Sequence, residues 1–424
     1  MARWWIGPKG SSTWPASSSG RGCGSPSSIS RAMKEEIFGR IAALRDRMEA
    51  EGIEAALVFQ KVDLFYLTGT MQDGLLYLDP SHELLLIRRH PPRAQEESPL
   101  ELVLPYSSLK ELPDLIRGHT GRLPEVIGLE MDVVPVGLFR RLQGLFPGGT
   151  FKDLSPLILH LRRRKSPWEV AMMERAGKIG RRVYEEVPRV LREGMTELEL
   201  AGKLLQVAMA HGHQEYIRMR GFNAEAHSWH VLSGPSGAVL SSIDAPMGGL
   251  GPSPAYPMGA SPKRIGRHEP ILIDFGTSYW GYQADETRCF SVGRLPQRLK
   301  DAFSATREIL AEVVALARPG VSCQRLFERG WEVARRLGYE DYFMGPEGYK
   351  TRFIGHGIGL EINEPPFIAE GHDYPLEEGM TVALEPKMVF PGEGAVGIEN
   401  TYLVTQGGLR SLTPAPEDLI EVSP

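Results

Sequence analysis

Residues 273–290 read IDFGTSYWGYQADETRCF and predict a β-hairpin in which each strand carries an aspartate. With the turn centred on Tyr279 and Trp280, Asp274 and Asp285 are equidistant from the centre and are expected to face each other across the ladder. Directly opposed residues have Cβ atoms about 4.5–5.5 Å apart, and two like charges at that separation destabilise a sheet. The hairpin therefore predicts a cation between the two carboxylates.

A second hairpin repeats this arrangement. Residues 382–400 read VALEPKMVFPGEGAVGIEN, with Glu385 and Glu399 symmetric about Gly392. Four carboxylates carry a charge of −4, which two divalent ions balance, and His356 in FIGHGIGLEINEPP adds a nitrogen ligand. The expected metal ligands are Asp274, Asp285, His356, Glu385 and Glu399.

These ligands also indicate which metal binds and what it does. A site rich in oxygen, with one imidazole and no thiolate, suits Mn²⁺ or Co²⁺, with Zn²⁺ and Fe²⁺ as alternatives. Two such ions about 3.5–4 Å apart can activate a bridging hydroxide that attacks a polarised carbonyl. Glu385 and His356 are the candidate catalytic residues, with Glu385 carrying the proton from the water to the leaving amine.

The same residues resemble the motifs of the pita-bread metallopeptidases, in the branch of Xaa-Pro aminopeptidases, prolidases and creatinase. The family pattern D-x-G with G-Y-x-x-D-x-T-R matches residues 274–288, G-H-G-I-G-L-E matches 355–361, and G-M-x-x-x-x-E-P matches 379–386. The resemblance covers about residues 34–424. It implies an α/β (α+β) protein in which a small N-terminal domain precedes a duplicated pita-bread domain.

Several positions depart from the family pattern. Met258 and Asn363 stand where family hydrolases carry histidines. The family's E-P-G reads E-P-K at Lys387, and its R-x-E-D reads GIEN, with Gly397 and Asn400. The expected ligands are therefore present, while the residues around them differ. A methionine cannot donate a hydrogen bond, so we expect weak turnover of standard substrates.

The resemblance implies a hydrolase of small peptides, of the Xaa-Pro dipeptidase or aminopeptidase type, that forms a homodimer. Met258, Asn363 and Arg220 are expected to line the substrate site, since an arginine can hold a carboxylate bidentately. His227 and His230 are candidates to replace a missing histidine, although a structural role is the simpler interpretation. Two alternatives remain: a metal-dependent lyase acting on dimethylsulfoniopropionate, and a binding protein without catalysis.

Hydrophobic periodicity suggests how the chain is divided. We expect a disordered extension over residues 1–32, an α/β domain over 33–155, a linker over 156–167 and the pita-bread domain over 168–424. In the last domain, helices at 168–187 and 196–211 precede the first acid hairpin, and helices at 297–317 and 322–337 precede the second. We interpret the basic run Arg162–Lys165 as a solvated linker or helix-start feature.

Composition narrows the remaining function classes. A net charge of −5 argues against nucleic-acid binding. No apolar run approaches the 18–20 residues of a membrane span, so we expect no membrane partner. Three cysteines without metal-like spacing do not indicate a disulfide framework. These features predict a cytoplasmic protein.

Overall fold

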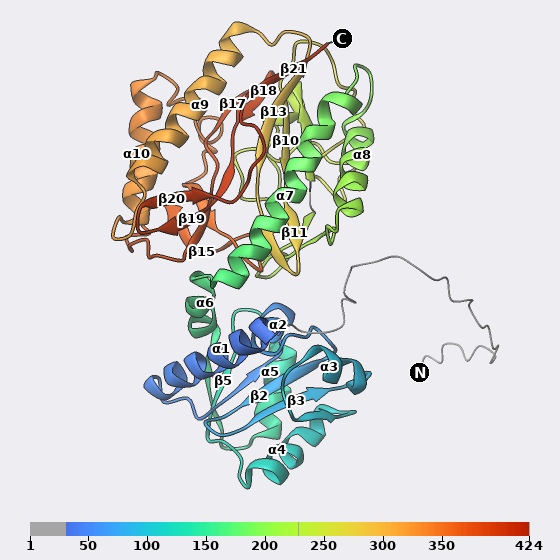
Figure 1. Ribbon diagram of the computed structural model, residues 1–424, viewed down its shortest axis with the longest axis vertical. Coiled ribbons are helices and arrows are strands. Elements are labelled where there is room, and N and C mark those ends of the chain that lie inside the picture. Colours follow the sequence, from blue (N-terminus) through green and yellow to red (C-terminus); the bar gives the residue numbers. More distant parts are fainter. Residues whose placement is uncertain (1–30, 228, 424) are drawn as a thin grey trace, which may run out of the picture.

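The computed structural model describes residues 31–227 and 229–423, which form two lobes joined near α6 (Figure 1). Most of the expected extension, residues 1–30, lies outside the described residues. Arg31 and Ala32 already belong to the first helix. None of the helices in the described ranges combines the length and the apolar character that a membrane span requires.

The N-terminal lobe is a six-stranded mixed sheet with helices packed against it. The strand order is β4-β3-β2-β1-β5-β6, and β1 is buried along its whole length at the centre. Its strands are β1 (Ala55–Val58), β2 (Gly74–Leu78), β3 (Glu83–Ile87), β4 (Val103–Pro105), β5 (Val126–Leu129) and β6 (Thr150–Asp153). Its helices are α1 (Arg31–Ala50), α2 (Lys61–Thr68), α3 (Pro91–Glu97), η1 (Leu109–Glu111), α4 (Leu112–Thr120) and α5 (Val136–Leu145). Helix α6 (Ser155–Arg163) occupies most of the segment expected as a linker.

The C-terminal lobe places strands between two helix pairs (Figure 1). The helices are α7 (Pro167–Val190), α8 (Glu197–Ala210), α9 (Gln297–Leu316) and α10 (Cys323–Arg336), with the 3₁₀ turn η2 (Gly234–Ala238). The first half contributes β7 (Tyr216–Ile217), β8 (Ala226–His227), β9 (Trp229–Ser233), β10 (Ile271–Phe275), β11 (Thr277–Tyr279), β12 (Tyr282–Ala284) and β13 (Thr287–Val292). The second contributes β14 (Phe353–Gly357), β15 (Glu364–Ala369), β16 (Thr381–Leu384), β17 (Lys387–Phe390), β18 (Gly394–Gly397), β19 (Asn400–Thr405), β20 (Gly408–Ser411) and β21 (Ile420–Val422).

The two helix pairs have the local chemistry that the sequence predicts. Thr196 caps α8, and its side chain and that of Glu199 form a reciprocal capping box. Ser322 caps α10 in the same way, by accepting from the Arg325 N–H. Each helix pair is followed by strands that carry acids, so the predicted duplication of helix pair and acid hairpin is confirmed.

The predicted register of the first acid hairpin is wrong by two residues. Tyr279 pairs with Tyr282, so the turn consists of Trp280 and Gly281, both with positive φ. Two consecutive positive φ values are typical of the type I′ turn, which matches the twist of the strands. As a result Asp274 lies opposite Thr287 and not opposite Asp285.

The second acid hairpin has the predicted register. Lys387 pairs with Gly397 on one side of the acids, and Leu384 pairs with Asn400 on the other. Both pairs are symmetric about Gly392, so Glu385 and Glu399 lie in register where the two ladders meet.

Buried ion pairs join the two lobes, which corrects the interpretation of the basic run. Arg162 is 2% exposed and contacts Asp63 at 2.8 Å, Glu361 at 2.8 Å and Glu364. Lys165 is also buried, 2.7 Å from Glu364. From the sequence alone the run looks solvent-exposed, because the acids that pair with it lie far away along the chain. Only Arg164 has a largely exposed side chain among these four basic residues.

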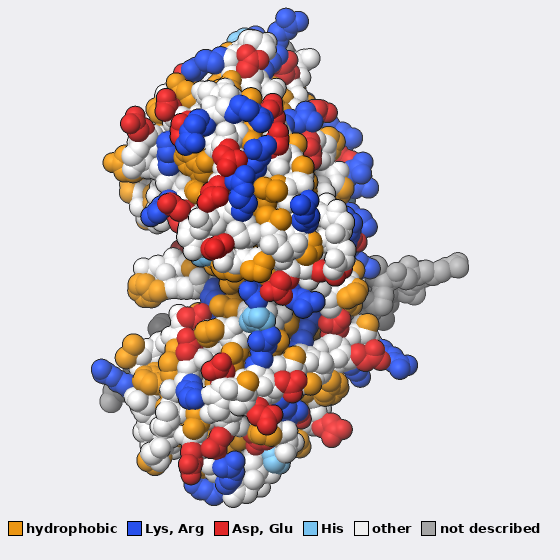
Figure 2. All heavy atoms as spheres, turned by 90° about the vertical axis from the view of Figure 1, so that its left-hand side faces the viewer, with side chains coloured by type: hydrophobic (Ala, Val, Ile, Leu, Met, Phe, Trp, Pro, Cys, Tyr) orange, Lys and Arg blue, Asp and Glu red, His pale blue; other side chains and the backbone are white. Residues whose placement is uncertain are grey.

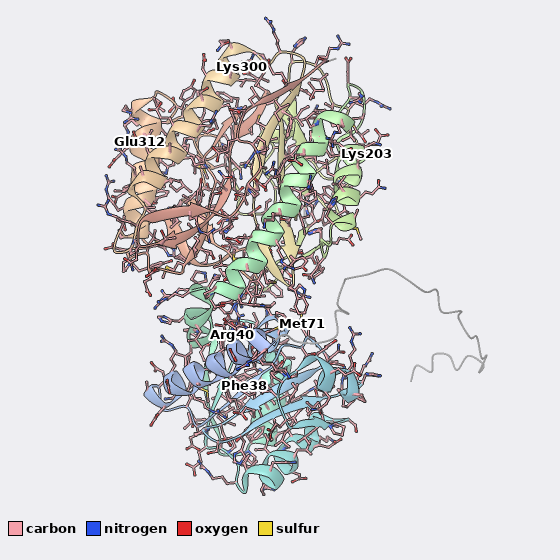
Figure 3. The ribbon with its side chains drawn as sticks, in the orientation of Figure 1. Phe38, Arg40, Met71, Lys203, Lys300 and Glu312 are labelled. Carbon is pink, nitrogen blue, oxygen red and sulfur yellow. The ribbon has the colours of Figure 1, made fainter. Side chains whose placement is uncertain are left out.

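A second contact between the lobes starts from α1. Arg40, labelled in Figure 3, donates to the Tyr66 carbonyl and lies 3.1 Å from the Glu169 carboxylate on α7. It also reaches the Tyr282 hydroxyl at 3.3 Å. This arginine therefore ties the N-terminal lobe to the helix and hairpin that lead to Asp285.

Candidate metal centre

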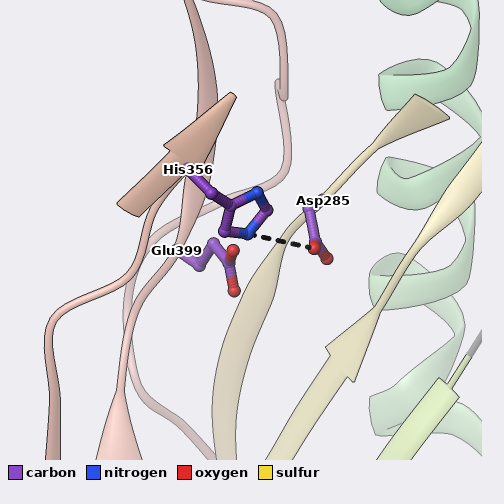
Figure 4. Close-up of side chains that lie close together, drawn as sticks. All are labelled: Asp285, His356 and Glu399. Atoms are coloured by element: carbon purple, nitrogen blue, oxygen red, sulfur yellow. Dashed lines mark ion pairs between the residues drawn. The ribbon is translucent and has the colours of Figure 1, made fainter. Parts of the chain in front are cut away.

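The five expected ligands come from both halves of the C-terminal lobe. Asp274 lies near the end of β10, Asp285 directly after β12, His356 in β14, Glu385 directly after β16 and Glu399 directly before β19. Figure 4 shows Asp285, His356 and Glu399 converging from separate strands. Each of these three offers a ligand atom, and these atoms all lie within 4.8 Å of one another.

In its neutral form the histidine turns the nitrogen without a proton toward the acids. His356 Nδ1 lies 3.1 Å from the Gly357 carbonyl oxygen, which can only accept, so Nδ1 carries the proton in the neutral ring. The lone pair of Nε2 then faces Asp285 Oδ2 at 4.0 Å and Glu385 Oε1 at 3.6 Å. Three electron-pair donors facing one another fit a cation between them.

Glu399 provides a second indication of a cation. Its Oε2 accepts from Thr287 Oγ1 at 2.8 Å and from Lys387 Nζ at 3.1 Å. Its Oε1 is buried and has no hydrogen-bond partner among the described residues. A buried carboxylate oxygen left unpaired costs about 1–3 kcal/mol or more, so this atom fits a metal ligand.

In the sequence Lys387 is only a departure from the family pattern, and the structure places it inside the acid cluster. Its side chain is 1% exposed. Nζ lies 2.5 Å from Glu385 Oε2, 3.1 Å from Glu399 Oε2 and 3.4 Å from Asp274 Oδ2. Side chains alternate along a strand, so Lys387 shares a face with Glu385. That alternation is the signal from which its position could have been found.

Burial and the excess of negative charge together govern the protonation of this cluster. Burial raises the pKa of the Asp285 carboxyl well above its usual range, and Glu399 and Asp274 raise it further. Burial also raises the pKa of Glu385. For Lys387, burial acts to lower the pKa, but Glu385, Glu399 and Asp274 outweigh it and hold the pKa well above its usual value. Lys387 is therefore a charged ammonium among carboxylates.

Arg288 supports the strand that follows Glu399. Its guanidinium donates to the backbone carbonyl of Glu399 and to the Asn400 side chain, each at 2.8 Å. Asp285 is held by Thr401, whose hydroxyl lies 2.9 Å from both the backbone N–H and the carbonyl oxygen of Asp285. Both residues thus fix the backbone from which the ligands project.

Two histidines lie beside the acid cluster. His230 pairs with Asp274 across β9 and β10, so their side chains share one face of the sheet. His227 lies beside it, with ring centroids 4.9 Å apart, and its Nδ1 is 2.5 Å from the Tyr256 hydroxyl. Burial, together with the nearby charge of Lys387, lowers the pKa of His230 to about 4. Both rings are therefore neutral at physiological pH.

The three expected substrate residues occupy different surroundings. Met258 is buried next to Gly259, where an added Cβ would lie 2.5 Å from His227 Nε2. Asn363 is exposed on the bend before β15. Arg220 binds Asp132 and Asp63 of the N-terminal lobe, at 2.5 and 2.8 Å. Their roles in substrate binding remain predictions.

A cleft of about 490 Å³ lies between the lobes. Phe65, Met71 and Gln72 line it from the N-terminal lobe, and Tyr216, Arg218 and Trp280 line it from the C-terminal lobe. Arg218 lies 4.9 Å from the centre of the Tyr216 ring, a cation–π distance that keeps the guanidinium at the cleft.

The fold and the ligand cluster together define a metal-dependent hydrolase built on a duplicated helix and hairpin unit. The model of metallopeptidase family M24 matches residues 171–406, and that of the creatinase/prolidase N-terminal domain matches residues 40–164. The chain therefore belongs to metallopeptidase family M24. Membership implies divalent metal ions and the hydrolysis of peptides, and it does not support the lyase or the binding protein.

Individual relatives resemble the chain over nearly its whole described length. An Xaa-Pro dipeptidase of Pyrococcus furiosus is 26% identical over 385 residues, which cover 90% of this chain and 99% of the relative. The X-Pro aminopeptidase of Thermotoga maritima superposes with a TM-score of 0.76 at 26% identity, covering 90% and 99%. The prolidase of Pyrococcus horikoshii superposes with a TM-score of 0.77 at 25% identity, covering 90% and 100%.

Proposed function

We propose that the chain cleaves the peptide bond that precedes proline in small peptides. The relatives named Xaa-Pro dipeptidase, prolidase and X-Pro aminopeptidase support this substrate class. The observation that carries the metal-dependent hydrolysis is that Asp285, His356 and Glu399 bring ligand atoms within 4.8 Å of one another, while Glu399 Oε1 is buried without a hydrogen-bond partner among the described residues. Mn²⁺ or Co²⁺ suits these ligands best, since oxygen predominates and thiolate is absent.

A divalent ion held by these residues would lower the pKa of a water molecule and polarise the substrate carbonyl. The residues supply the remaining steps. Glu385 directs Oε1 toward His356 and Oε2 toward Lys387, so it is held in place and can accept a proton from water. The same carboxyl then delivers the proton to the leaving amine.

We infer that the cleft between the lobes receives the rest of the peptide. We propose that Arg218 holds the carboxylate of a dipeptide, since its guanidinium lines this cleft and Arg220 is already paired. The homodimer and the cytoplasmic location remain expectations from the sequence. On the face shown in Figure 2, acidic and basic side chains are interspersed.

The test is a dipeptide panel with metal-loaded protein. We expect the protein to release proline from Gly-Pro and Ala-Pro and to leave Met-Ala uncleaved. Asp285→Ala should reduce this activity to background, while the surface variant Asp418→Ala should retain it. If the wild-type protein with bound metal leaves every Xaa-Pro dipeptide intact, the proposed substrate class is wrong.

A further inference from the structure

The feature that the peptidase assignment does not explain is the buried lysine among the metal ligands. An ammonium carries three N–H donors and accepts no hydrogen bond. Lys387 Nζ has three carboxylate oxygens around it, from Glu385, Glu399 and Asp274, at 2.5, 3.1 and 3.4 Å. The lysine thus uses its full donor capacity within the site.

The oxygens that contact the lysine and those that face the histidine belong to two adjacent cation positions. Glu385 turns Oε2 to Lys387 and Oε1 to His356. Glu399 gives Oε2 to Lys387 and keeps Oε1 unpaired. Two carboxylates therefore connect a position already filled by an ammonium with a second position beside His356 and Asp285.

A divalent ion does not fit the first position while the lysine occupies it. Such an ion needs carboxylate oxygens at about 2.0–2.2 Å, and these oxygens already surround Nζ. An ion placed among them would lie in contact with a like charge in a buried, low-dielectric environment, where repulsion is strong.

The chain also provides space for this lysine on the opposite strand. Lys387 of β17 pairs with Gly397 of β18. A Cβ added at Gly397 would lie 2.6 Å from Lys387 Cγ and 3.0 Å from the Pro386 carbonyl oxygen. A side chain at position 397 would therefore displace the lysine from the acids.

The departures at Lys387 and Gly397 are thus a single exchange across a hairpin. The expected E-P-G has lysine at its last position, and the expected R-x-E-D has glycine at its first. A glycine and a basic residue have changed strands, and the register places them opposite each other. The lysine position is therefore coupled to its surroundings and is not an isolated substitution.

We propose that the ammonium of Lys387 takes the place of one of the two metal ions, so that the chain binds a single divalent ion through Asp285, His356, Glu385 and Glu399. The remaining acid, Asp274, pairs with the lysine. This inference rests on the proposed metal centre. It changes the expected number of divalent ions per chain from two, as the four carboxylates alone had suggested, to one.

The experiment is a calorimetric titration of the full, metal-free chain with Mn²⁺, with the bound metal counted after gel filtration. We expect one ion per chain for the wild type and two for Lys387→Gly, because that variant frees three carboxylates. Lys165→Met removes another buried lysine, outside the site, and should still bind one ion. Circular dichroism confirms that each variant is folded.

A measurement on the wild type alone keeps the inference testable if Lys387→Gly does not fold. A single Mn²⁺ should give the electron paramagnetic resonance spectrum of an isolated ion, whereas two ions about 3.5–4 Å apart would couple. Two ions in the wild type, or one ion in folded Lys387→Gly, would overturn the inference and leave the peptidase assignment standing. A wild type that binds no Mn²⁺ would overturn the metal centre and this inference together.

Discussion

The buried arginine between the lobes offers the sharpest test of how they are held together. We predict that Arg162→Met destabilises the protein strongly. Methionine keeps much of the side-chain volume but removes the charge that faces Asp63, Glu361 and Glu364. All four side chains are at most 2% exposed, so water cannot replace the lost partner.

The magnitude follows from what each acid retains in the variant. Glu364 keeps Lys165 at 2.7 Å and Asp63 keeps Arg220 at 2.8 Å. The Glu361 oxygen that contacts Arg162 keeps only Arg220, at 3.9 Å. Breaking a buried pair by removing one partner costs about 3–5 kcal/mol, and we expect a value in this range. With an unfolding entropy of about 2.1 cal/mol/K per residue over a cooperative unit of about 400 residues, this lowers the melting temperature by about 4–6 °C.

Differential scanning calorimetry measures the shift, and Arg164→Met is the matched control. Arg164 belongs to the same basic run, its side chain is 61% exposed and its nearest acid is 4.0 Å away, so a change within about 0.5 kcal/mol is expected. Burial already raises the pKa of Glu361, and protonation removes the unpaired charge, so the deficit of Arg162→Met should shrink as the pH falls. Equal melting temperatures for the two variants would refute the assignment of Arg162 as a buried link.

Three further predictions concern the site and its surroundings. Glu399→Gln keeps the shape but weakens a ligand, so its Mn²⁺ affinity in calorimetry should fall by at least about 10²-fold, since even indirect supports of a ligand cost 10–100-fold; an unchanged affinity would contradict its role. Met258→His combined with Asn363→His should raise kcat/KM on Ala-Pro by up to about 10²-fold at equal metal loading, because it restores two donors; strong turnover by the wild type would instead direct attention to other donors. Burial lowers the pKa of His213 to about 4, below its usual 6.5, so the unfolded chain binds a proton that the folded chain does not, and stability is lost as the pH falls through this window. His213→Gln, which can still accept from the Ser278 N–H at 3.0 Å, should flatten the pH dependence of the free energy of unfolding between these values, and an unchanged slope would show that other groups cause it.

Local signals predicted the fold well, and long-range pairing limited the rest. Caps such as Thr196 are short-range chemistry, so the helix pairs could be found from sequence. The first acid hairpin was shifted because Trp280, a bulky residue, adopts a positive φ that its type rarely shows. Arg162 was misjudged because its partner acids lie far away in sequence. The position of Lys387 could have been predicted, since strand alternation places it on the face of Glu385.

The pairing of Lys387 with Gly397 makes the effects of mutations at these two positions non-additive. A side chain added at 397 meets the lysine opposite at 2.6 Å, and in a chain with glycine at 387 that clash would be gone, leaving the contacts with the Pro386 carbonyl oxygen at 3.0 Å and the Cα of residue 387 at 3.1 Å. A scan of single substitutions would therefore record position 397 as intolerant and attribute the defect to glycine itself. The pairing would also restrict the order of substitutions during evolution, because lysine fits at position 387 only after position 397 has lost its side chain.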